Sequence, residues 1–530
     1  MTVLDIDHAP GGYVLIQSPY DEIIKSHYDA MPGFRWSKQD RAYVAPLEAA
    51  RIVLATLKKA RTAKFDQSLL KHPHAKYEAP RHKLDLTDLR EYQKDGARFI
   101  VDTVSTYGSA LLADDMGLGK SLQALRAARC LKPDARMLIV CPAVVTGHWI
   151  EQAQKWLGEP AVRLTAKSAE WDGIATVSYD TLRSIGKSKT PMPMAGLIVL
   201  DEIHYLSNSK SQRSAIVSHY VNTCRKTHSA PIIGTSGTPM NTRIRDLWHP
   251  LNVLFPGRFG TWWKFTERYC DGSYEEIKAI EKQVWRSDGS SNLDELNERL
   301  RAVMLRRERH AVGELPPRTR VTIPVDLPGA IVKQLQRAAA SLHGEHGLSK
   351  LLGNVELWKL NATVELARDI IEQGGKVLIF TVRRDTARQL SETLKLPYVT
   401  GAVPAHKRKK ILTDGALHCN GAVATMFSVP TGIDLYDFNT AIFVGLDYVP
   451  STMLQAEARI HRIGQTLPVT VYFMIGLRTV DEVIRSTVVE RLGYYERVLG
   501  DAAAAEMSAD LSGSEEEIIK SIVQMVREMK

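Results

Sequence analysis

Short apolar runs alternate with amphipathic stretches from about residue 84 onward, and this alternation predicts α/β architecture. Each run ends at a polar loop, as buried parallel strands do. The expected strands are Leu111–Ala113, Met137–Cys141, Ala175–Ser178, Leu197–Leu200, Pro231–Gly234, Val377–Phe380, Ala422–Met426, Ala441–Val444 and Val469–Met474. Helical periodicity lies between them, for example over Leu86–Ile100, Ala330–Ala339 and Leu351–Gln373.

A different pattern precedes this region and predicts a small α+β module. The expected elements are a strand at Tyr13–Gln17, a helix at Glu22–Ala30, a hairpin over Pro32–Pro46 and a helix at Leu47–Leu57. The hairpin interleaves aromatic and basic residues, namely Arg35, Trp36, Lys38, Arg41 and Tyr43. Such a surface can hold a nucleic-acid backbone and stack on bases. Alternatively, the rings form the core of the module and the charges are solvated.

The last thirty residues predict a linker and a helix. Residues 501–513 are rich in alanine, and we expect them to form the linker. Ser514 and Glu517 form a capping box at the start of an amphipathic pattern, so a helix is expected from there to the end of the chain.

Composition narrows the class of protein only slightly. The chain has 530 residues, a net charge of +9, a pI near 9.1 and 24% charged residues. This balance permits a polyanionic partner. The five cysteines include no CxxC pair, which disfavours a zinc site or a disulfide framework. No apolar run reaches the ~18 residues of a membrane-spanning helix, and we expect no membrane association.

The stretch Leu111–Ser121 is a candidate phosphate-binding loop. An apolar strand leads into Gly117 and Gly119, and Lys120 and Ser121 then open a helix. Backbone N–H groups there can bind phosphate, the lysine can reach the β- and γ-phosphates, and the serine can ligate Mg²⁺. Asp114 stands where the generic Walker pattern has a glycine, so an ordinary glycine-rich turn is the alternative. The residues expected to contact nucleotide are Asp115, Met116, Gly117, Leu118, Gly119, Lys120 and Ser121.

A second polar cluster follows the strand Leu197–Leu200. Asp201 is expected to hold Mg²⁺, and Glu202 to orient or deprotonate an attacking water. The next expected strand ends in Gly234–Met240, whose small hydroxylated residues suit contact with a γ-phosphate. Gln93, upstream of the phosphate loop, is a candidate for binding an adenine edge.

Four motifs together resemble the Swi/Snf-type DNA translocases of helicase superfamily two. They are DDMGLGKS, DEIH, SGTP and, far downstream, QAEARIHRIGQT (Gln455–Thr466). The resemblance covers residues 84–495 and implies two RecA-like lobes that hydrolyse ATP with Mg²⁺ between them. The domains expected are 1–83, 84–318, 319–500 and 501–530.

Further roles follow from the resemblance, residue by residue. Gln93 matches the adenine-reading glutamine, and Trp149 and Tyr179 lie in two loops that match DNA-tracking loops. Arg306 and Arg307 lie in the segment that leads to the second lobe, and are candidates for coupling or DNA contact. Gly432 and Asp434 match a motif that contacts nucleotide and DNA, although the family often has asparagine at the second position. Arg459 and Arg462, expected three apart on one helical turn, would supply an arginine finger.

The N-terminal hairpin resembles the HARP-type module of annealing helicases. The favoured function is therefore an ATP-driven translocase on double-stranded DNA that rewinds or remodels branched DNA. A nucleosome remodeller, a strand-separating helicase and a catalytically inactive clamp are the alternatives. We expect a monomer that binds duplex, forked or partly single-stranded DNA. It would act in the cytoplasm or nucleoid of a bacterial or viral host, or in a eukaryotic nucleus. Lys407–Lys410 (KRKK) is expected to begin a surface helix rather than to act as a localisation signal.

Overall fold

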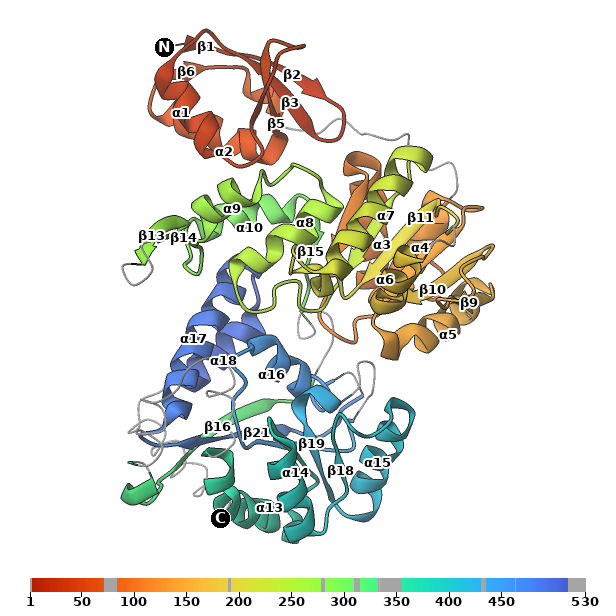
Figure 1. Cartoon of the computed structure of the whole chain (residues 1–530), viewed down its shortest axis with the longest axis vertical. Helices are drawn as coiled ribbons and strands as arrows, with labels where there is room; N and C mark the ends of the chain where they lie inside the picture. The colour runs from red at the N-terminus through yellow and green to blue at the C-terminus, as the bar shows by residue number, and fades with distance from the viewer. Residues whose placement is uncertain are drawn as a thin grey trace. The chain divides into compact units, whose positions relative to one another are not determined.

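The computed structural model describes residues 2–70, 83–188, 192–277, 282–308, 315–331, 333, 355–429, 435–462 and 464–512. The chain divides into two compact units. The first unit comprises Met1–Arg307 with Arg497–Gly500, and the second comprises Glu308–Glu496 with Asp501–Lys530 (Figure 1). Both contain a parallel sheet with helices, so the predicted α/β class is confirmed.

The first unit begins with an α+β module. Its antiparallel sheet has the order β2-β3-β5-β4 and is accompanied by a two-stranded pair, β1 with β6. The elements are β1 (Thr2–Val3), β2 (Asp5–Ala9), β3 (Tyr13–Gln17), α1 (Glu22–Ala30), β4 (Arg35–Ser37), β5 (Ala42–Pro46), α2 (Leu47–Lys59) and β6 (Ala63–Lys64). The predicted strand at 13–17, helix at 22–30 and hairpin are therefore present. A core that includes Ile16, Ile24, Tyr28 and Leu54 joins the sheet to both helices.

The rest of the first unit is built on a seven-stranded parallel sheet of order β15-β7-β12-β11-β8-β10-β9. The strands are β7 (Ser109–Leu112), β8 (Met137–Cys141), β9 (Ala161–Arg163), β10 (Ile174–Ser178), β11 (Leu197–Asp201), β12 (Ile232–Thr235) and β15 (Met304–Leu305). The helices that precede or connect them are α3 (Glu91–Tyr107), α4 (Lys120–Leu131), α5 (Thr146–Leu157), α6 (Tyr179–Lys187) and α7 (Gln212–His228). Apolar residues of α3, α4 and α5 pack together with those of the central strands in one core. The predicted strands differ from the observed ones by two residues at most.

The helix predicted over Leu86–Ile100 is wrong at both ends, because α3 runs from Glu91 to Tyr107. The Asp85 side chain accepts a hydrogen bond from the Thr87 backbone N–H (2.9 Å), and Asp88 has a φ of 61°. This turn excludes residues 85–88 from the helix, since a positive φ interrupts right-handed helical geometry.

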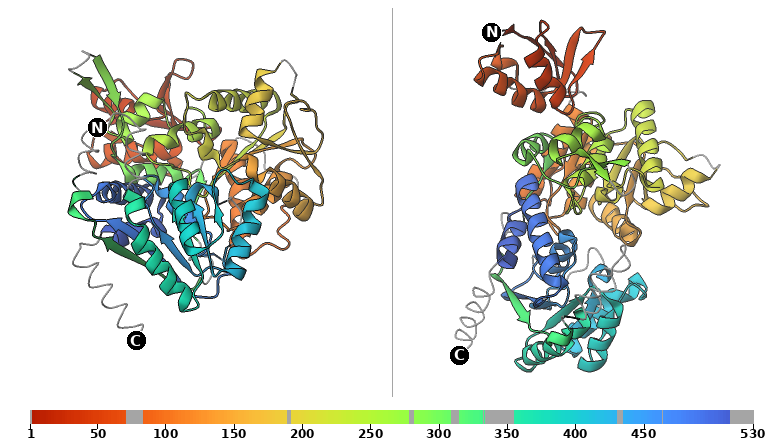
Figure 2. Two further views of the ribbon diagram at one scale, coloured as in Figure 1. Left: turned by 60° about the horizontal axis from the view of Figure 1, so that its bottom comes forward. Right: turned by 60° about the vertical axis from the view of Figure 1, so that its left-hand side comes forward.

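A helical insertion follows β12 and joins the α+β module to the sheet. It contains α8 (Trp248–Leu254), α9 (Trp262–Tyr269), a hairpin of β13 (Ser273–Ile277) and β14 (Lys282–Arg286), and α10 (Leu293–Arg301). Figures 1 and 2 show the module, in red, beside these green elements, and α10 contacts α2. The sequence did not predict this docking.

Arg258, between α8 and α9, is the centre of that contact. Its guanidinium forms a buried ion pair with Glu48 (Nε–Oε1 2.9 Å, Nη2–Oε2 2.6 Å) and donates to the carbonyls of Gly11 and Gly12 at 3.0 Å each. It also lies over the ring of Tyr107, 4.4 Å from the centroid. Through Arg258, the module is therefore connected both to the insertion and to Tyr107, the last residue of α3.

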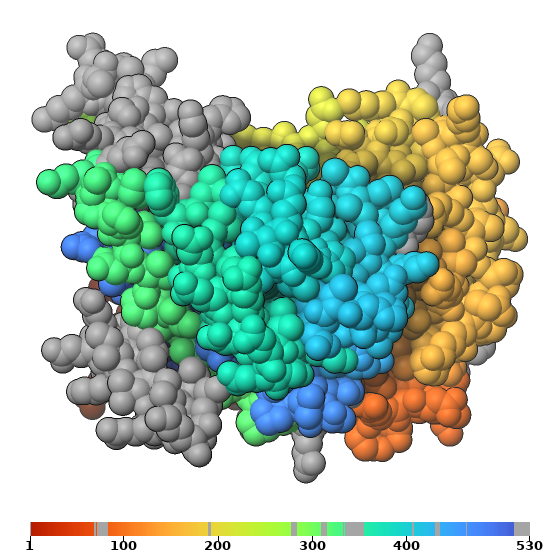
Figure 3. Space-filling view, turned by 90° about the horizontal axis from the view of Figure 1, so that it is seen from below, coloured from red at the N-terminus to blue at the C-terminus, as the bar shows by residue number. Residues whose placement is uncertain are grey.

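The second unit contains a six-stranded parallel sheet of order β16-β21-β20-β17-β19-β18. The strands are β16 (Arg318–Val325), β17 (Val377–Thr381), β18 (Tyr398–Val399), β19 (Gly421–Thr425), β20 (Thr440–Phe443) and β21 (Val469–Gly476). The helices are α13 (Leu360–Glu372), α14 (Arg384–Leu394), α15 (Ala405–His418), α16 (Pro450–Glu457), α17 (Val480–Leu499) and α18 (Ala502–Ser512). Residues of about 360–420, teal to light blue in Figure 3, cover the face of this unit seen there. KRKK lies in the first turns of α15, as predicted.

Residues 502–512 form the helix α18 and are not the predicted linker. Ala504, Met507 and Leu511 are buried along one side of the helix. The other side lies near β16, where Arg320 donates to the Asp510 carboxylate (3.1 Å). Alanine is the best helix former, and the spacing of these three residues suits one buried face. The helix predicted beyond Ser514, like residues 334–339, lies outside the described residues. Among the helices that are described, none is long and apolar enough to span a membrane.

Candidate nucleotide-hydrolysis site

The phosphate loop of the first unit connects β7 to α4. Gly117 and Gly119 have φ values of 87° and 76°, which a residue with a side chain rarely adopts. A Cβ at Gly119 would also lie 2.4 Å from Nε2 of Gln93. Both glycines are therefore required by the shape of the loop.

Lys120, the first residue of α4, points back onto the loop. Its ammonium group donates to the carbonyls of Asp114 (2.7 Å) and Asp115 (3.0 Å). Burial lowers the pKa of Lys120, while the charges of Glu202, Asp114 and Asp201 oppose that shift. The ammonium group is thus held by two backbone carbonyls of the loop, in an environment that the nearby carboxylates make negative.

Gln93 lies against the same loop. Its Nε2 donates to the Leu118 carbonyl (3.2 Å), and its Oε1 accepts from the Arg90 backbone N–H (3.1 Å). This residue therefore helps to fix the loop, and its contact with adenine stays a prediction. The other residues predicted to bind nucleotide, Asp115 to Gly119 and Ser121, all lie in the loop or in the first turn of α4.

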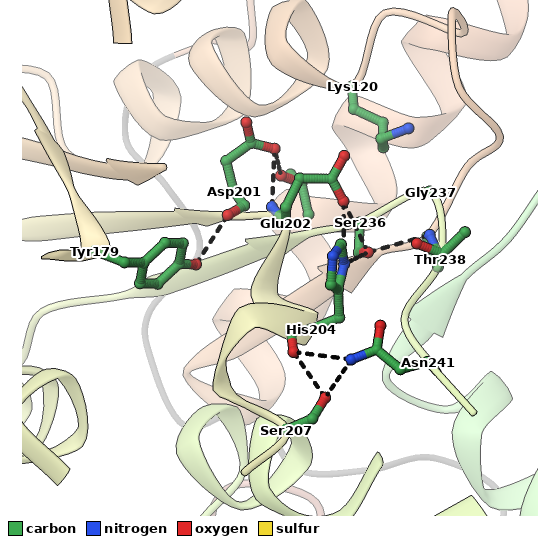
Figure 4. Close-up of polar contacts among 12 residues, drawn as sticks. Lys120, Tyr179, Asp201, Glu202, His204, Ser207, Ser236, Gly237, Thr238 and Asn241 are labelled. Atoms are coloured by element: carbon green, nitrogen blue, oxygen red, sulfur yellow. Dashed lines mark hydrogen bonds and ion pairs between the residues drawn. The ribbon is translucent and has the colours of Figure 1, made fainter. Parts of the chain in front are cut away.

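Asp201 ends β11 and is held by three groups from other parts of the first unit and by the backbone of the next residue. Its carboxylate accepts hydrogen bonds from the Thr235 hydroxyl (2.7 Å), the Trp149 indole (2.7 Å) and the Glu202 backbone N–H (3.1 Å). Its backbone carbonyl accepts a bond from the Tyr179 hydroxyl (2.8 Å) (Figure 4). These contacts allow one orientation of the carboxylate.

Glu202 has a left-handed backbone conformation, with a φ of 50°, and its carboxylate belongs to a second network. Oε2 accepts from the Ser236 hydroxyl (3.1 Å) and lies 3.2 Å from Nδ1 of His204. The Ser236 oxygen in turn accepts from the Thr238 backbone N–H (3.1 Å). As Figure 4 shows, the SGTP loop and the DEIH segment thus meet at this one carboxylate.

The two adjacent carboxyl groups have different proton affinities. Burial, followed by the charge of Glu202, raises the pKa of Asp201 to about 6. Burial also acts to raise the pKa of Glu202, but the hydrogen bond and charge of His204, together with Lys120, outweigh it and lower that pKa to about 2. Glu202 is therefore the more acidic of the two carboxyl groups.

Trp149 and Tyr179, predicted to contact nucleic acid, are instead buried around Asp201. Each side chain is 1% exposed, and each uses its polar atom to bind Asp201. In this arrangement neither ring presents a face to a partner. The sequence motifs predicted that both residues lie in loops at strand ends. They did not indicate that the polar atoms of both side chains point towards Asp201.

Arg306 and Arg307, predicted to couple the lobes or to contact DNA, lie against the phosphate loop. Arg306 is near Asp115 (3.1 Å), and Arg307 is near Asp114 (3.0 Å). Their guanidinium groups are mostly buried, so a direct DNA contact does not fit this arrangement.

The hairpin of the N-terminal module keeps its predicted surface. Trp36 on β4 is 50% exposed and packs edge-on against Tyr43, with 5.1 Å between ring centroids. Arg35 and Arg41 are exposed on the same hairpin. The core of the module includes Tyr28 and Phe34, while Tyr43 is partly buried against it. The alternative that the rings of the hairpin are wholly core is therefore wrong for Trp36.

In the second unit, Arg459 and Arg462 do not share a helical turn, because α16 ends at Glu457. Gln465 fixes the segment that follows, donating from Nε2 to the carbonyls of Tyr436 (2.9 Å), Phe438 (2.9 Å) and Ile460 (3.2 Å). No role was predicted for Gln465, although it belongs to the RIGQ motif. Gly432 and Asp434 lie outside the described residues.

Comparisons with known proteins agree with these motifs. Residues 92–337 match the model of the SNF2-related domain, and residues 358–464 match that of the helicase conserved C-terminal domain. The chain is 27% identical over 438 residues to "DNA annealing helicase and endonuclease ZRANB3" of Mus musculus, covering 75% of this chain and 39% of that protein. It is 28% identical over 452 residues to "SWI/SNF-related matrix-associated actin-dependent regulator of chromatin subfamily A-like protein 1" of Xenopus tropicalis, covering 79% of this chain and 45% of that protein.

The chain thus spans less than half the length of either relative. Among solved structures, the "Sulfolobus solfataricus SWI2/SNF2 ATPase core in complex with dsDNA" aligns with 83% of this chain and 98% of that one, with a TM-score of 0.39 and 22% identity.

Proposed function

Because the chain belongs to the SNF2 family of helicase-type ATPases, we propose that it uses ATP hydrolysis to move along double-stranded DNA and to rewind or remodel branched DNA. The observation that carries the proposal is the pair Asp201 and Glu202 beside the buried Lys120. Each carboxylate is held by its own set of donors, and both influence the lysine that faces the phosphate loop.

The roles within the first unit follow from this geometry. Lys120 would leave the carbonyls of Asp114 and Asp115 and bind the β- and γ-phosphates of ATP. Glu202, ionised and held by Ser236, would orient the attacking water and accept its proton. The Ser236 contact would also transmit the loss of the γ-phosphate to the SGTP loop.

The residues present fit Mg²⁺, which prefers oxygen ligands. The Asp201 carboxylate offers about four lone-pair directions, and three protein donors take up part of them. The Ser121 hydroxyl and Asp201 would hold the ion, and the ion would neutralise charge on the phosphates. The protein donors around Asp201 keep that carboxylate oriented for this task.

We further propose that the second unit completes the ATP site. At least one of Arg459 and Arg462 would act as an arginine finger on the γ-phosphoryl group. Gly432 and Asp434 remain proposed contacts from the same lobe. Binding and loss of the γ-phosphate would then alternate the grip of the two lobes on DNA, which converts hydrolysis into movement.

The N-terminal hairpin is the proposed site for recognising forked or partly single-stranded DNA. Trp36 offers a ring on which a base can stack, and Arg35 and Arg41 can bind phosphates. The module is docked through the buried Arg258. Deleting the module would therefore expose Arg258 and leave it without its partner Glu48. The variant Trp36→Ala is therefore the better test, with Tyr20→Ala, another exposed aromatic residue of the module, as the control.

The decisive experiment measures the ATPase rate of the full chain with no nucleic acid, duplex DNA, single-stranded DNA, forked DNA and RNA. Stimulation by duplex or forked DNA, together with triplex displacement and strand annealing, is the expected result. Stimulation by RNA alone, or separation of strands without triplex displacement, would replace the proposal with a strand-separating helicase. Movement of nucleosomes without annealing would favour a chromatin remodeller.

A further inference from the structure

Residues 303–307 run beside the phosphate loop as an additional strand. The backbone N–H groups of Leu111, Ala113 and Asp115 donate to the carbonyls of Val303 (3.0 Å), Leu305 (2.7 Å) and Arg307 (2.9 Å). The first half of the Leu111–Ser121 stretch is therefore attached to a segment that comes much later in the chain.

Arg307 binds the residue that replaces the glycine of the generic Walker pattern. Its Nε donates to Oδ1 of Asp114 (3.0 Å), and its Nη2 donates to Oδ2 of the same carboxylate. The Asp114 side chain has no exposed surface. A buried carboxylate needs a cationic partner, since an unpaired one is strongly unfavourable. Asp114 and Arg307 are thus required together.

Gln123 extends this pair to the far side of the loop. Its Oε1 accepts from Arg307 (2.8 Å), while its Nε2 donates to the Leu118 carbonyl (3.0 Å). The loop is consequently fixed on both sides of Gly117, at Asp114 and at Leu118.

Gly96, in the middle of α3, provides independent support. A Cβ at this position would lie 1.7 Å from Oε1 of Gln123 and 2.5 Å from Nη2 of Arg307. Glycine within a helix is destabilising by about 1 kcal/mol relative to alanine. The helix therefore contains an unfavourable residue at the one place where Arg307 and Gln123 need the space.

Arg306 makes a parallel set of contacts one residue earlier. Nη1 donates to the carbonyls of Ala113 (2.9 Å) and Gly237 (3.1 Å), and Nη2 binds the Asp115 carboxylate (3.1 Å). It therefore joins the start of the phosphate loop to the SGTP loop.

We propose that Arg307, acting through Asp114, is a positioning residue that sets the affinity of the phosphate loop for nucleotide. The carbonyls of Asp114 and Asp115 hold the Lys120 ammonium group, so any displacement of these two residues displaces the lysine that binds phosphate. The inference rests on the proposed function only for the identity of the nucleotide.

The test is a titration of the full chain with fluorescently labelled ADP and Mg²⁺, without DNA. Arg307→Gln and Asp114→Asn should each weaken ADP binding at least tenfold. The loss of ADP affinity in the double variant should be smaller than the two single losses multiplied together. The double variant leaves no unpaired buried charge, whereas each single variant does. Arg98→Gln, which removes an exposed ion pair with Asp95 on α3, is the matched control and should stay within twofold of the unaltered chain.

A second readout separates positioning from a general loss of folded protein. In ATPase assays Arg307→Gln should raise KM for ATP by more than it lowers kcat, whereas partial unfolding lowers kcat at unchanged KM. Arg307→Lys, which keeps the charge but not the two-point contact, should give an intermediate affinity for ADP.

Arg307→Gln that binds ADP within twofold of Arg98→Gln would overturn the inference. If Arg307→Gln does not fold, Arg307→Lys and Asp114→Asn decide, and unaltered ADP affinity in both overturns it as well. Failure of DNA to stimulate the unaltered chain would refute the proposed function and leave this result intact, because the titration involves neither DNA nor turnover.

Discussion

Arg258 and Glu48 are 210 positions apart in sequence and form an ion pair in which both side chains are almost fully buried. Its removal should undock the N-terminal module. Glu48→Gln leaves a buried guanidinium without its countercharge, which is destabilising by about 3 kcal/mol or more. Limited proteolysis should then cleave within the module (residues 2–70) much faster than in the unaltered chain. Asp29→Asn removes an exposed ion pair of the same module and should leave the cleavage rate unchanged. Equal cleavage of both variants would contradict the anchoring role of Glu48.

Glu202→Gln should separate ATP binding from hydrolysis. The amide keeps the size of the side chain but cannot accept a proton, so binding of ATP should persist while turnover falls to background. Ser236→Ala removes one donor to Glu202 and should produce a smaller loss. Rapid ATPase activity in Glu202→Gln would remove this residue from the mechanism.

Trp149→Phe tests whether the indole orients Asp201. The change deletes one hydrogen bond to a carboxylate proposed to hold Mg²⁺, and losses of this kind reduce metal affinity or activity about ten- to hundredfold. Raising the Mg²⁺ concentration should recover part of the ATPase rate. The control is Trp156→Phe on the same helix, whose indole donates to Gln152 (2.7 Å). If the two variants behave alike, the Trp149 bond has no special importance.

Arg462→Ala should lower DNA-stimulated turnover roughly a thousandfold if this residue is the arginine finger. Arg459→Ala, measured in parallel, identifies which of the two residues acts on the phosphoryl group. Arg478→Ala, which changes an exposed arginine of the same unit, should leave turnover unaffected. Full activity in both Arg459→Ala and Arg462→Ala would exclude a finger from this motif.

Glu457 should make the second unit sensitive to acid. Although burial acts to raise the pKa of Glu457, Arg320 and Arg318 outweigh it and lower the pKa from 4.5 to about 2. Ionised Glu457 therefore stabilises the folded second unit. At 1.36 kcal/mol per pKa unit, this contribution to the free energy of unfolding is about 3 kcal/mol at most. This contribution is complete above about pH 4.5 and is lost as the pH falls towards 2. Chemical denaturation at several pH values should show this slope, and Glu457→Gln should flatten it. Glu506→Gln, which changes a largely exposed partner of Arg318, should retain it.

The sequence predicted the parts of the fold that depend on local pattern. Buried parallel strands such as Met137–Cys141 are continuous apolar runs, and the strand was found with those bounds. The end of α16 could not be predicted in this way, because the residues after Glu457 have ordinary helical propensity. Beyond the end of the helix, the Arg459 carbonyl accepts a hydrogen bond from the Leu435 backbone N–H (3.0 Å), and Gln465 binds the carbonyls of Tyr436 and Phe438. These contacts join parts of the chain that are distant in sequence.

The candidate site shows the same division. Lys120, Asp201 and Glu202 stand in motifs that can be recognised in a linear sequence, whereas their supporting contacts join residues far apart. Trp149 is 52 positions from Asp201, and Arg307 is 193 positions from Asp114. For α18 the prediction of a linker is wrong because alanine favours helix, and because Ala504, Met507 and Leu511 are spaced so that they share one buried face.

The helix α3 is held at both ends by groups that belong to different functions. Gln93 in its first turn binds the phosphate loop. The ring of Tyr107, at its last position, lies under the guanidinium of Arg258, the residue to which the N-terminal module docks. At 1.5 Å and 100° per residue, inserting or deleting one residue would rotate one end by about 100° relative to the other. The length of this helix therefore sets how the two ends face their partners. Natural variants of the chain should tolerate substitutions on its exposed side but no change in its number of residues.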